Sequence, residues 1–494
     1  MTLCDILWKS IALAAQPTVE SHQQMRIGLW MSARRSGRSE ETYLRTIGGL
    51  WFPNSKEKMD MLTFLTGRRY RDCDGTTRRD FLKVGTLGVG ALSLPALLRA
   101  RAQAAEQGRL TKSTSVIWIW LGGGPTHVET FDPKLTAPKE YRSVTGEVQT
   151  KIPGITIGGT FPKIAQVVDK MAIVRSFAHS NSGHGGGTHW LMTGYNNRNI
   201  DNGGLPSRPS IGSIVSRVRG SNHPITGMPT YVRLGRIGSD GPAFLGAANS
   251  PFDPSGQARS NMQLTIDQSR LTTRRKLLAG LDNINRKVDR SGLMQGLDAF
   301  EQQAFSLVLS RSQQAFDLKY EDPRAVARYG AGLGQQLLRA RRLCQAGAGF
   351  VTVSYGGWDM HSKIEENITK RSPQLDHSVN ALIEDLHQSG MQDDVLLVIA
   401  GEFGRTPKIN KNAGRDHWAP LTTLALSGGG LKMGQVVGES AAKVDVPKTK
   451  PVRPQDLMAT VFGVLGLDRK VQFVDNFGRP VYMIEHGKPI AELV

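Results

Sequence analysis

Four short runs of almost entirely apolar residues recur along the chain and are rich in β-branched or aromatic side chains. The clearest is SVIWIWL at residues 115–121, which ends in the three glycines 122–124. A continuous apolar run of this length is typical of a strand buried on both faces of a parallel sheet. The pattern predicts four such strands, at residues 115–121, 171–174, 350–354 and 395–400.

Stretches with apolar residues three or four positions apart lie between these runs, around residues 164–168, 337–343 and 375–386, and a last one covers 454–465. Strands that alternate with helices predict the α/β class, with a doubly wound, mostly parallel sheet. Between about residues 235 and 324 the strand pattern stops, and a polar stretch gives way to a charged helical pattern. We interpret this segment as a small helical insertion.

The N-terminal part of the chain carries an export pattern. Arg78 and Arg79 precede a Gly-rich and Ala-rich apolar run at 84–98, and the small residues Ala102 and Ala104 follow. This order is typical of a twin-arginine signal, which we place at residues 61–104. A membrane helix is the alternative, but the run falls short of the roughly 20 apolar residues that cross a bilayer. We therefore expect a periplasmic or secreted protein with no stable membrane span.

Residues 1–60 precede this signal and mix Trp, Arg and Ser without a sustained period. Because such a signal normally lies near a terminus, we interpret the segment as an upstream or disordered extension and expect the natural start at Met59 or Met61. The folded domain would then be residues 105–494, which is long enough to bury a large core.

The net charge of the chain favours some classes of ligand, and its cysteine content limits the disulfides it can form. The whole chain carries a formal net charge of +19, and residues 105–494 keep +12. A basic surface favours anionic ligands, although a merely solvated surface explains it equally well. The chain has no zinc-finger spacing and no arginine block with interleaved aromatics, so we expect no nucleic acid partner. Cys344 is the only cysteine after residue 104, which excludes an intrachain disulfide in the exported part.

Polar side chains gather directly after the predicted strands. Five clusters stand out, at residues 125–132, 179–189, 356–361, 401–406 and 416–417, and four of them contain histidine in a chain with only 11 histidines. In open α/β sheets, ligands bind beyond the carboxyl ends of the strands. These clusters are therefore the expected place for chemistry.

Six side chains in these clusters are candidate metal ligands: His127, Asp359, His361, Glu402, Asp416 and His417. Asp359 and His361 lie two positions apart just beyond a strand, where a turn can direct both at one ion. Mixed imidazole and carboxylate sets suit zinc, manganese or calcium, and we expect one or two divalent ions. For each residue alone, a helix cap, an ion pair with arginine or a satisfied loop histidine is the alternative.

Arg405 follows a glycine at a strand end, where its guanidinium could contact two oxygens of a sulfate or phosphate; a salt bridge to Glu402 is the alternative. The glycine runs 122–124 and 185–187 would let backbone amides approach an anion, and tight turns explain them as well. The chain contains no Gly-x-Ser-x-Gly elbow, no Gly-x-Gly-x-x-Gly after a strand and no His-Glu-x-x-His. Serine esterases, dinucleotide enzymes and zincin proteases are therefore disfavoured.

The order of these motifs resembles domain of unknown function family 1501. The resemblance is carried by GGGPTH at 122–127, TFDPK at 130–134, the histidines of 179–184, GWDMH at 357–361, GEFGRT at 401–406 and DH at 416–417. It covers nearly all of the chain after the signal. Members of that family look like relatives of alkaline phosphatases and sulfatases, which implies a metal site at strand ends and cleavage of phosphate or sulfate esters.

Three departures from that superfamily pattern concern the catalytic centre. The nucleophile position, ten residues before the glycine of Met192-Thr193-Gly194, holds His184 here. The carboxylate expected after the first strand is replaced by glycines 122–124. The Asp-His-Gly motif is rewritten as Glu402-Phe403-Gly404, which keeps a carboxylate and loses an imidazole.

Two functions follow from this pattern. The leading hypothesis is an exported hydrolase that cleaves an anionic ester, with one ion held by Asp359, His361 and His417, helped by Glu402 or Asp416. His184 would act as a general acid or base or as a phosphoryl acceptor, and Arg405 would steady the anionic transition state. The alternative is a non-catalytic protein on the same fold, whose anion pocket binds a sulfated or phosphorylated glycan or docks a partner protein.

Overall fold

The computed structural model describes residues 114–255 and 311–494. The chain divides into two units, Met1–Leu97 and Leu98–Val494, and all the described residues belong to the second, which is compact. The expected extension at 1–60, the signal at 61–104 and most of the expected helical insertion lie outside the described residues.

No helix among the described residues has the length and hydropathy needed to cross a membrane.

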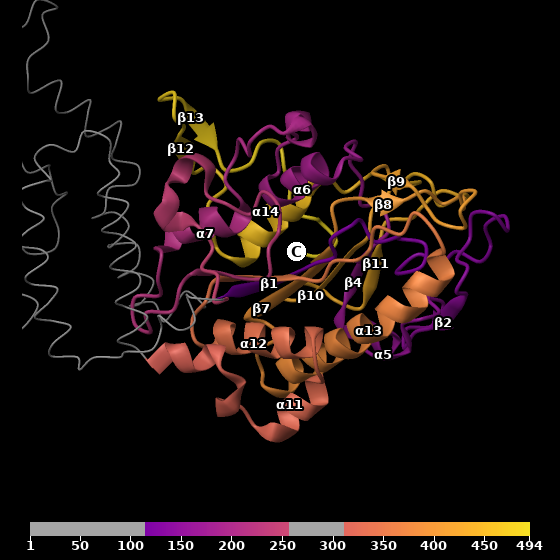
Figure 1. Ribbon diagram of the computed structural model, residues 1–494, viewed down its shortest axis with the longest axis horizontal. Coiled ribbons are helices and arrows are strands. Elements are labelled where there is room, and N and C mark those ends of the chain that lie inside the picture. The colour runs from indigo at the N-terminus through magenta and orange to yellow at the C-terminus, as the bar shows by residue number, and fades with distance from the viewer. Residues whose placement is uncertain (1–113, 256–310) are drawn as a thin grey trace, which may run out of the picture. The chain divides into compact units, whose positions relative to one another are not determined.

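A seven-stranded sheet forms the centre of the second unit, in the order β11-β4-β10-β7-β1-β6-β5 (Figure 1). The strands are β1 Ser115–Trp120, β4 Ala172–Val174, β5 Tyr231–Leu234, β6 Phe350–Ser354, β7 Val395–Ala400, β10 Leu424–Gly428 and β11 Gln435–Val437. β10 pairs antiparallel with both β4 and β7, and the other pairs in the sheet are parallel. The predicted α/β class with a mostly parallel sheet is confirmed.

Helices cover both faces of this sheet (Figure 1). One face packs against α5 Pro162–Ala165, α12 Leu333–Gln345 and α13 Ile364–Gln388, with α11 Pro323–Tyr329 outside them. The other packs against α6 His184–Thr193, α7 Ile211–Arg219 and α14 Pro454–Val464.

Strand β1 explains why the sheet needs cover on both sides. Ile117 and Ile119 belong to the core under α12 and α13, whereas Val116 and Trp118 belong to the core under α7 and α14. Side chains alternate between the faces of a strand, so a continuous apolar run buries both faces. Each fully buried side chain of this size contributes about 1.5–3 kcal/mol.

The remaining elements are short. Three two-stranded ribbons pair β2 Glu147–Gln149 with β3 Thr156–Gly158, β8 Gly404–Arg405 with β9 His417–Trp418, and β12 Gln472–Val474 with β13 Pro480–Tyr482. The 3-10 helices are η4 Val168–Lys170, η5 Arg198–Asn202, η6 Ala243–Leu245, η7 Ala247–Asn249, η8 Arg311–Phe316 and η9 Leu318–Tyr320.

Topology brings the polar loops together. Strands β7, β1 and β6 are parallel neighbours, so their carboxyl ends open at one edge of the sheet. The loops that follow them carry Glu402, Gly123 and Asp359. The β8–β9 ribbon then pairs Arg405 with His417 and returns His417 to the same edge.

Candidate metal and catalytic site

Asp359 is the common partner of three histidines that come from different segments. Its Oδ1 lies 3.0 Å from His361 Nε2 and 3.2 Å from His417 Nε2. Its Oδ2 lies 3.4 Å from Nε2 of His184, the first residue of α6. The structure therefore brings together four of the residues singled out in the sequence.

The other ring nitrogen of each histidine faces an acceptor. Nδ1 of His184 lies 2.8 Å from Glu402 Oε1, Nδ1 of His361 lies 3.0 Å from Asp416 Oδ1, and Nδ1 of His417 lies 2.9 Å from the Ser182 carbonyl oxygen. A neutral ring that donates from Nδ1 to one of these acceptors presents the lone pair of its Nε2 to Asp359. In this tautomer, all three Nε2 atoms carry a lone pair that can bind a cation.

Four side chains thus form one group of possible acceptors, which we call the acceptor corner: Nε2 of His184, His361 and His417, and the carboxylate of Asp359. His361 Nε2 and His417 Nε2 lie 3.0 Å apart, a distance at which a cation or a proton shared by the two lone pairs is favourable. Ligand atoms of His184, Asp359 and His417 all lie within 4.8 Å of one another, as a shared ion requires. The four ligands of a zinc ion lie about 3.3 Å from one another. The donor set therefore fits a divalent ion.

Glu402 acts on this corner through His184. Its side chain is buried, and Oε1 accepts a 2.8 Å hydrogen bond from the Gly123 backbone N–H as well as facing His184 Nδ1. Oε2 is buried and has no hydrogen-bond partner among the described residues. A carboxylate that holds the far nitrogen of a metal-binding imidazole is a recurrent feature of metal sites.

Arg405 is part of the site, but its guanidinium has no free pair of N–H groups. Its side chain is fully buried, and its ion pair goes to Asp359, not to Glu402. Nε donates to the Gly124 carbonyl at 2.9 Å, Nη1 to the Arg415 carbonyl at 3.0 Å, and Nη2 to the Gly123 carbonyl. A contact of 3.4 Å from Nη1 to His361 Nε2 uses the fifth N–H. The guanidinium therefore holds Asp359 in place and has no N–H left for a substrate.

Burial, hydrogen bonds and neighbouring charges shift the pKa values of the residues at this site in different directions. Although burial alone would raise it, the hydrogen bond and charge of Arg405 lower the pKa of Asp359 to about 2. The hydrogen bond to Glu402 raises the pKa of His184. Burial, aided by the positive charge of Arg405, lowers the pKa of His417. The hydrogen bond from His361 lowers the pKa of Asp416. Titratable groups whose pKa values are shifted in this way are typical of functional sites.

His127 lies apart from this group of contacts. Its ring is buried, Nε2 lies 2.8 Å from the Val444 carbonyl oxygen, and burial lowers the pKa of the ring. None of its described contacts is with Asp359 or the three histidines. Its Nδ1 is buried without a hydrogen-bond partner among the described residues, so His127 is a core histidine with one of its two ring nitrogens satisfied.

The two glycine runs serve close packing at the site. Gly123 has φ of 111° and Gly124 has φ of 74°, both in the left-handed region. A Cβ at Gly123 would lie against the backbone of Asp359, and one at Gly124 would enter the Phe403 ring. A Cβ at Gly187 would lie 2.8 Å from the Glu402 carbonyl oxygen. These positions bring the loops after β1 and β7 and the start of α6 into contact.

Phe403 packs beside two of the imidazoles in the site. Its ring is fully buried, with its centroid 4.3 Å from that of His417 and 5.0 Å from that of His184. It packs the two imidazoles and supplies no ligand atom. Among the described residues, no metal-binding group separate from Asp359 and its histidines is found.

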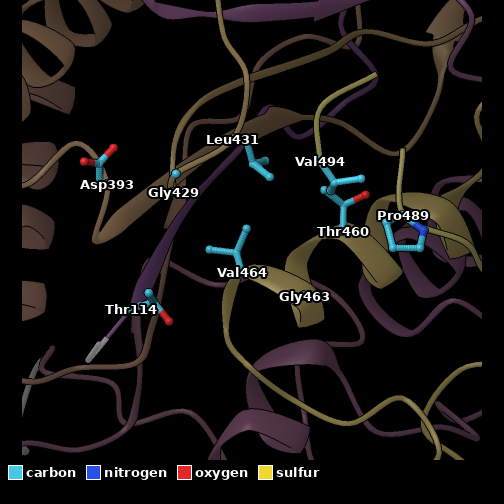
Figure 2. Close-up of a pocket in the computed structure, with 10 residues that line it drawn as sticks. Thr114, Asp393, Gly429, Leu431, Thr460, Gly463, Val464, Pro489 and Val494 are labelled. Atoms are coloured by element: carbon cyan, nitrogen blue, oxygen red, sulfur yellow. The ribbon is translucent and has the colours of Figure 1, made fainter. Parts of the chain in front are cut away.

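A separate cavity of about 630 Å³ lies at the other ends of the central strands (Figure 2). It is lined by Thr114, Asp393, Gly429, Gly430, Leu431, Thr460, Gly463, Val464, Pro489 and Val494. Thr114 and Asp393 precede β1 and β7, so this cavity is at the amino ends of the strands. Its side chains include a single carboxylate and no histidine, and we do not place the chemistry there.

Comparison with known proteins identifies the family. The family model described as "Protein of unknown function (DUF1501)" matches residues 113–494. The chain belongs to this family. The resemblance read from the motifs is therefore confirmed, and Asp359 and the three histidines all lie within the DUF1501 region. No curated protein matches the chain.

Several solved structures resemble this DUF1501 protein at low identity. They include the PsFucS1 sulfatase from Pseudoalteromonas sp., with 12% identity over 76% of this chain and 72% of that chain and a TM-score of 0.36. The phosphonate monoester hydrolase SpPMH from Silicibacter pomeroyi shows 13% identity, 76% coverage of each chain and a TM-score of 0.35. The lipoteichoic acid synthase LtaP from Listeria monocytogenes shows 11% identity, coverage of 72% and 73%, and a TM-score of 0.32. With values this low, these matches do not bear on the chemistry of the chain.

Proposed function

We propose that this protein is an exported, metal-dependent hydrolase of phosphate or sulfate esters. The observation that carries the proposal is the acceptor corner, in which the Nε2 atoms of three imidazoles and the Asp359 carboxylate meet at the carboxyl ends of the strands. The net charge of +12 after residue 104 supports an anionic substrate. Export rests on the twin-arginine pattern in the sequence.

His184, Asp359 and His417 are the residues that would hold a zinc, manganese or calcium ion. His184 Nε2 and Asp359 Oδ2 are not engaged by Arg405, whereas Asp359 Oδ1 and His361 Nε2 both face its N–H groups. A cation is less favourable next to a guanidinium, so the set with His184 is preferred over the expected set with His361. When bound, the ion would polarise the ester or lower the pKa of a water.

His361 is the proposed proton-transfer residue. Asp416 Oδ1 holds its Nδ1 at 3.0 Å, and its Nε2 lies beside the ligand His417, while nearly half of the side chain is open to solvent. An imidazole oriented by a carboxylate is a standard general acid or base. His184 and His361 thus exchange the roles expected from the sequence.

The second candidate function is a non-catalytic anion-binding or glycan-binding protein, and the hydroxyl groups near His184 favour it. Thr188 Oγ1 donates to the His184 carbonyl at 2.6 Å, and Ser182 Oγ accepts from the Ala419 N–H at 3.1 Å. Neither hydroxyl is described in contact with Asp359. A covalent route through a hydroxyl therefore lacks support, and hydrolysis would use water directly.

Metal content and turnover together test the proposal. Purified protein is analysed by elemental mass spectrometry and assayed with aryl phosphates and aryl sulfates. His417→Ala should lose the ion and all turnover, because His417 contributes one of the three ligand atoms. His377→Ala, on the exposed side of α13 where Nδ1 lies 2.8 Å from Lys163 Nζ, is the matched control and should keep both. Bound metal and a bound sulfated glycan without turnover would favour the binding protein.

A further inference from the structure

Glu129 and Arg415 form a fully buried ion pair next to the acceptor corner. Arg415 Nη2 donates to Glu129 Oε1 at 2.6 Å, and neither side chain has any exposed surface. Arg415 immediately precedes Asp416 and His417 in the chain. Glu129 lies in the loop after β1, where its Oε2 also accepts from Thr126 Oγ1 at 2.6 Å.

Arg415 reaches each of the loops that carry the site. Its Nη1 donates to the carbonyls of Thr406, at 3.1 Å, and Pro407, in the segment after β7. Its backbone N–H donates at 3.1 Å to the carbonyl of Met360, which lies between Asp359 and His361. Its own carbonyl accepts from Arg405 Nη1 at 3.0 Å. One residue thus connects the loops after β1, β6 and β7.

Burying two charges is costly, and an apolar pair of similar volume often gives a fold of equal stability. Stability alone therefore does not explain a charged pair at this place. What the guanidinium adds is direction, because its donors point at carbonyl oxygens in fixed geometry. The residues held by these contacts are Asp416, which fixes His361, and His417, which Asp359 contacts.

We propose that the Glu129–Arg415 pair is a positioning device that sets the spacing of His361, His417 and Asp359. This inference rests on the proposed function, since it assigns the pair to the same metal and proton-transfer site. Neither residue touches the ion or the substrate in this arrangement. Their effect is exerted through the backbone at residues 406 and 415–417.

The test compares two apolar replacements of buried ion pairs in the full chain. In Glu129→Leu/Arg415→Met, the charges behind the site are removed together. The matched control is Asp385→Leu/Arg341→Met, which removes a buried pair with a 3.0 Å contact between α12 and α13. Thermal unfolding verifies that each variant folds. Zinc affinity is measured by chelator competition, and imidazole NMR of the metal-free proteins reports the surroundings of His361 and His417.

Zinc affinity should fall by about 10–100-fold in Glu129→Leu/Arg415→Met, the usual effect of losing residues that orient metal ligands, with shifted signals from His361 and His417. The control should keep wild-type affinity and signals. A folded site variant with wild-type affinity and imidazole signals would overturn the inference. If wild-type protein binds no zinc, the proposed function fails, but the imidazole signals of the metal-free proteins still decide the inference.

If the double variant does not fold, Arg415→Lys is decisive. Lysine keeps the charge near Glu129 but lacks the fork that reaches the Thr406 and Pro407 carbonyls. A folded Arg415→Lys protein should bind zinc more weakly than wild type and show displaced His417 signals. Wild-type behaviour in this variant would show that charge alone suffices and would refute the positioning role.

Discussion

His361 Nε2 and His417 Nε2 lie 3.0 Å apart, and in the tautomers that donate from Nδ1 to Asp416 and to the Ser182 carbonyl these two atoms face each other with their lone pairs. Two such atoms repel unless a cation or a proton lies with them. Asp359 and His184 bring further acceptor atoms to the same point. This gathering of candidate ligand atoms is the physical basis for the metal proposal and for the predictions that follow.

Removing each outer histidine separately should distinguish their roles. His184→Ala should lose the ion, because Nε2 of His184 is one of three ligand atoms that lie within 4.8 Å of one another. His361→Ala should retain the ion and lose turnover by about 100-fold or more, the usual contribution of a general acid or base. Elemental analysis and steady-state kinetics measure the two effects. The reverse result, with metal lost only in His361→Ala, would restore the ligand set expected from the sequence.

Glu402→Gln should weaken metal binding while keeping the fold. The amide is close in shape but cannot offer the hydrogen bond to a carboxylate, with its charge, that raises the pKa of His184 and makes it a stronger ligand. We expect zinc affinity to fall by about 10–100-fold. In the metal-free variant, NMR titration should show the pKa of His184 moving down. An unchanged His184 titration would mean that the 2.8 Å contact does not act on the ring.

Metal retention should depend on pH in a direction set by His184. Its pKa is raised, so it stays protonated to a higher pH than an ordinary histidine, and an ion must displace that proton. His417 has a lowered pKa and competes only at lower pH. Affinity should therefore decline first as pH falls through the pKa of His184, by about tenfold per pH unit for one displaced proton. Chelator competition from about pH 8 to about pH 5 measures this, and a flat profile would exclude His184 as a ligand.

The same pKa shift fixes the sign of a stability effect in the metal-free protein. A histidine whose folded pKa is raised stabilises the fold below its unfolded pKa, and this contribution disappears as pH rises through the folded pKa. The difference in unfolding free energy between wild type and Glu402→Gln should therefore be largest at mildly acidic pH and smallest at alkaline pH. Denaturant titrations at both pH values measure it. A difference that grows with pH would contradict the assigned direction.

Long apolar runs made much of the fold predictable. The predicted runs at 350–354 and 395–400 coincide with β6 and β7, because strands buried on both faces leave no polar interruption. β5, at Tyr231–Leu234, was not predicted, since it is four residues long and contains Arg233. The antiparallel β10 was not predicted either, because strand direction depends on pairing, which an apolar run does not encode.

The site was predictable in membership but not in roles. The strand-end rule located Asp359, His184 and His417, since β6, β4 and β7, which precede them, run in one direction and end on one side of the sheet. It could not show that Arg405 is buried with all its N–H groups in use, because that depends on carbonyl positions at Gly123 and Gly124. The Ser182 carbonyl that faces His417 Nδ1 has no sequence signal, since every residue has a carbonyl.

Gly124→Ala should disturb the site through Phe403. Gly124 has φ of 74°, and an added Cβ would enter the Phe403 ring, which packs against both His184 and His417. We expect a loss of about 2–3 kcal/mol of unfolding free energy, the sum of left-handed strain and overpacking, together with weaker metal binding. Gly146→Ala isolates the strain, since Gly146 has φ of 72° and open space around its Cβ position. That control should lose only about 1 kcal/mol and keep its metal affinity, because it leaves the imidazoles in place. Equal losses in both variants would show that Phe403 accommodates the extra methyl group and does not couple the glycine loop to the histidines.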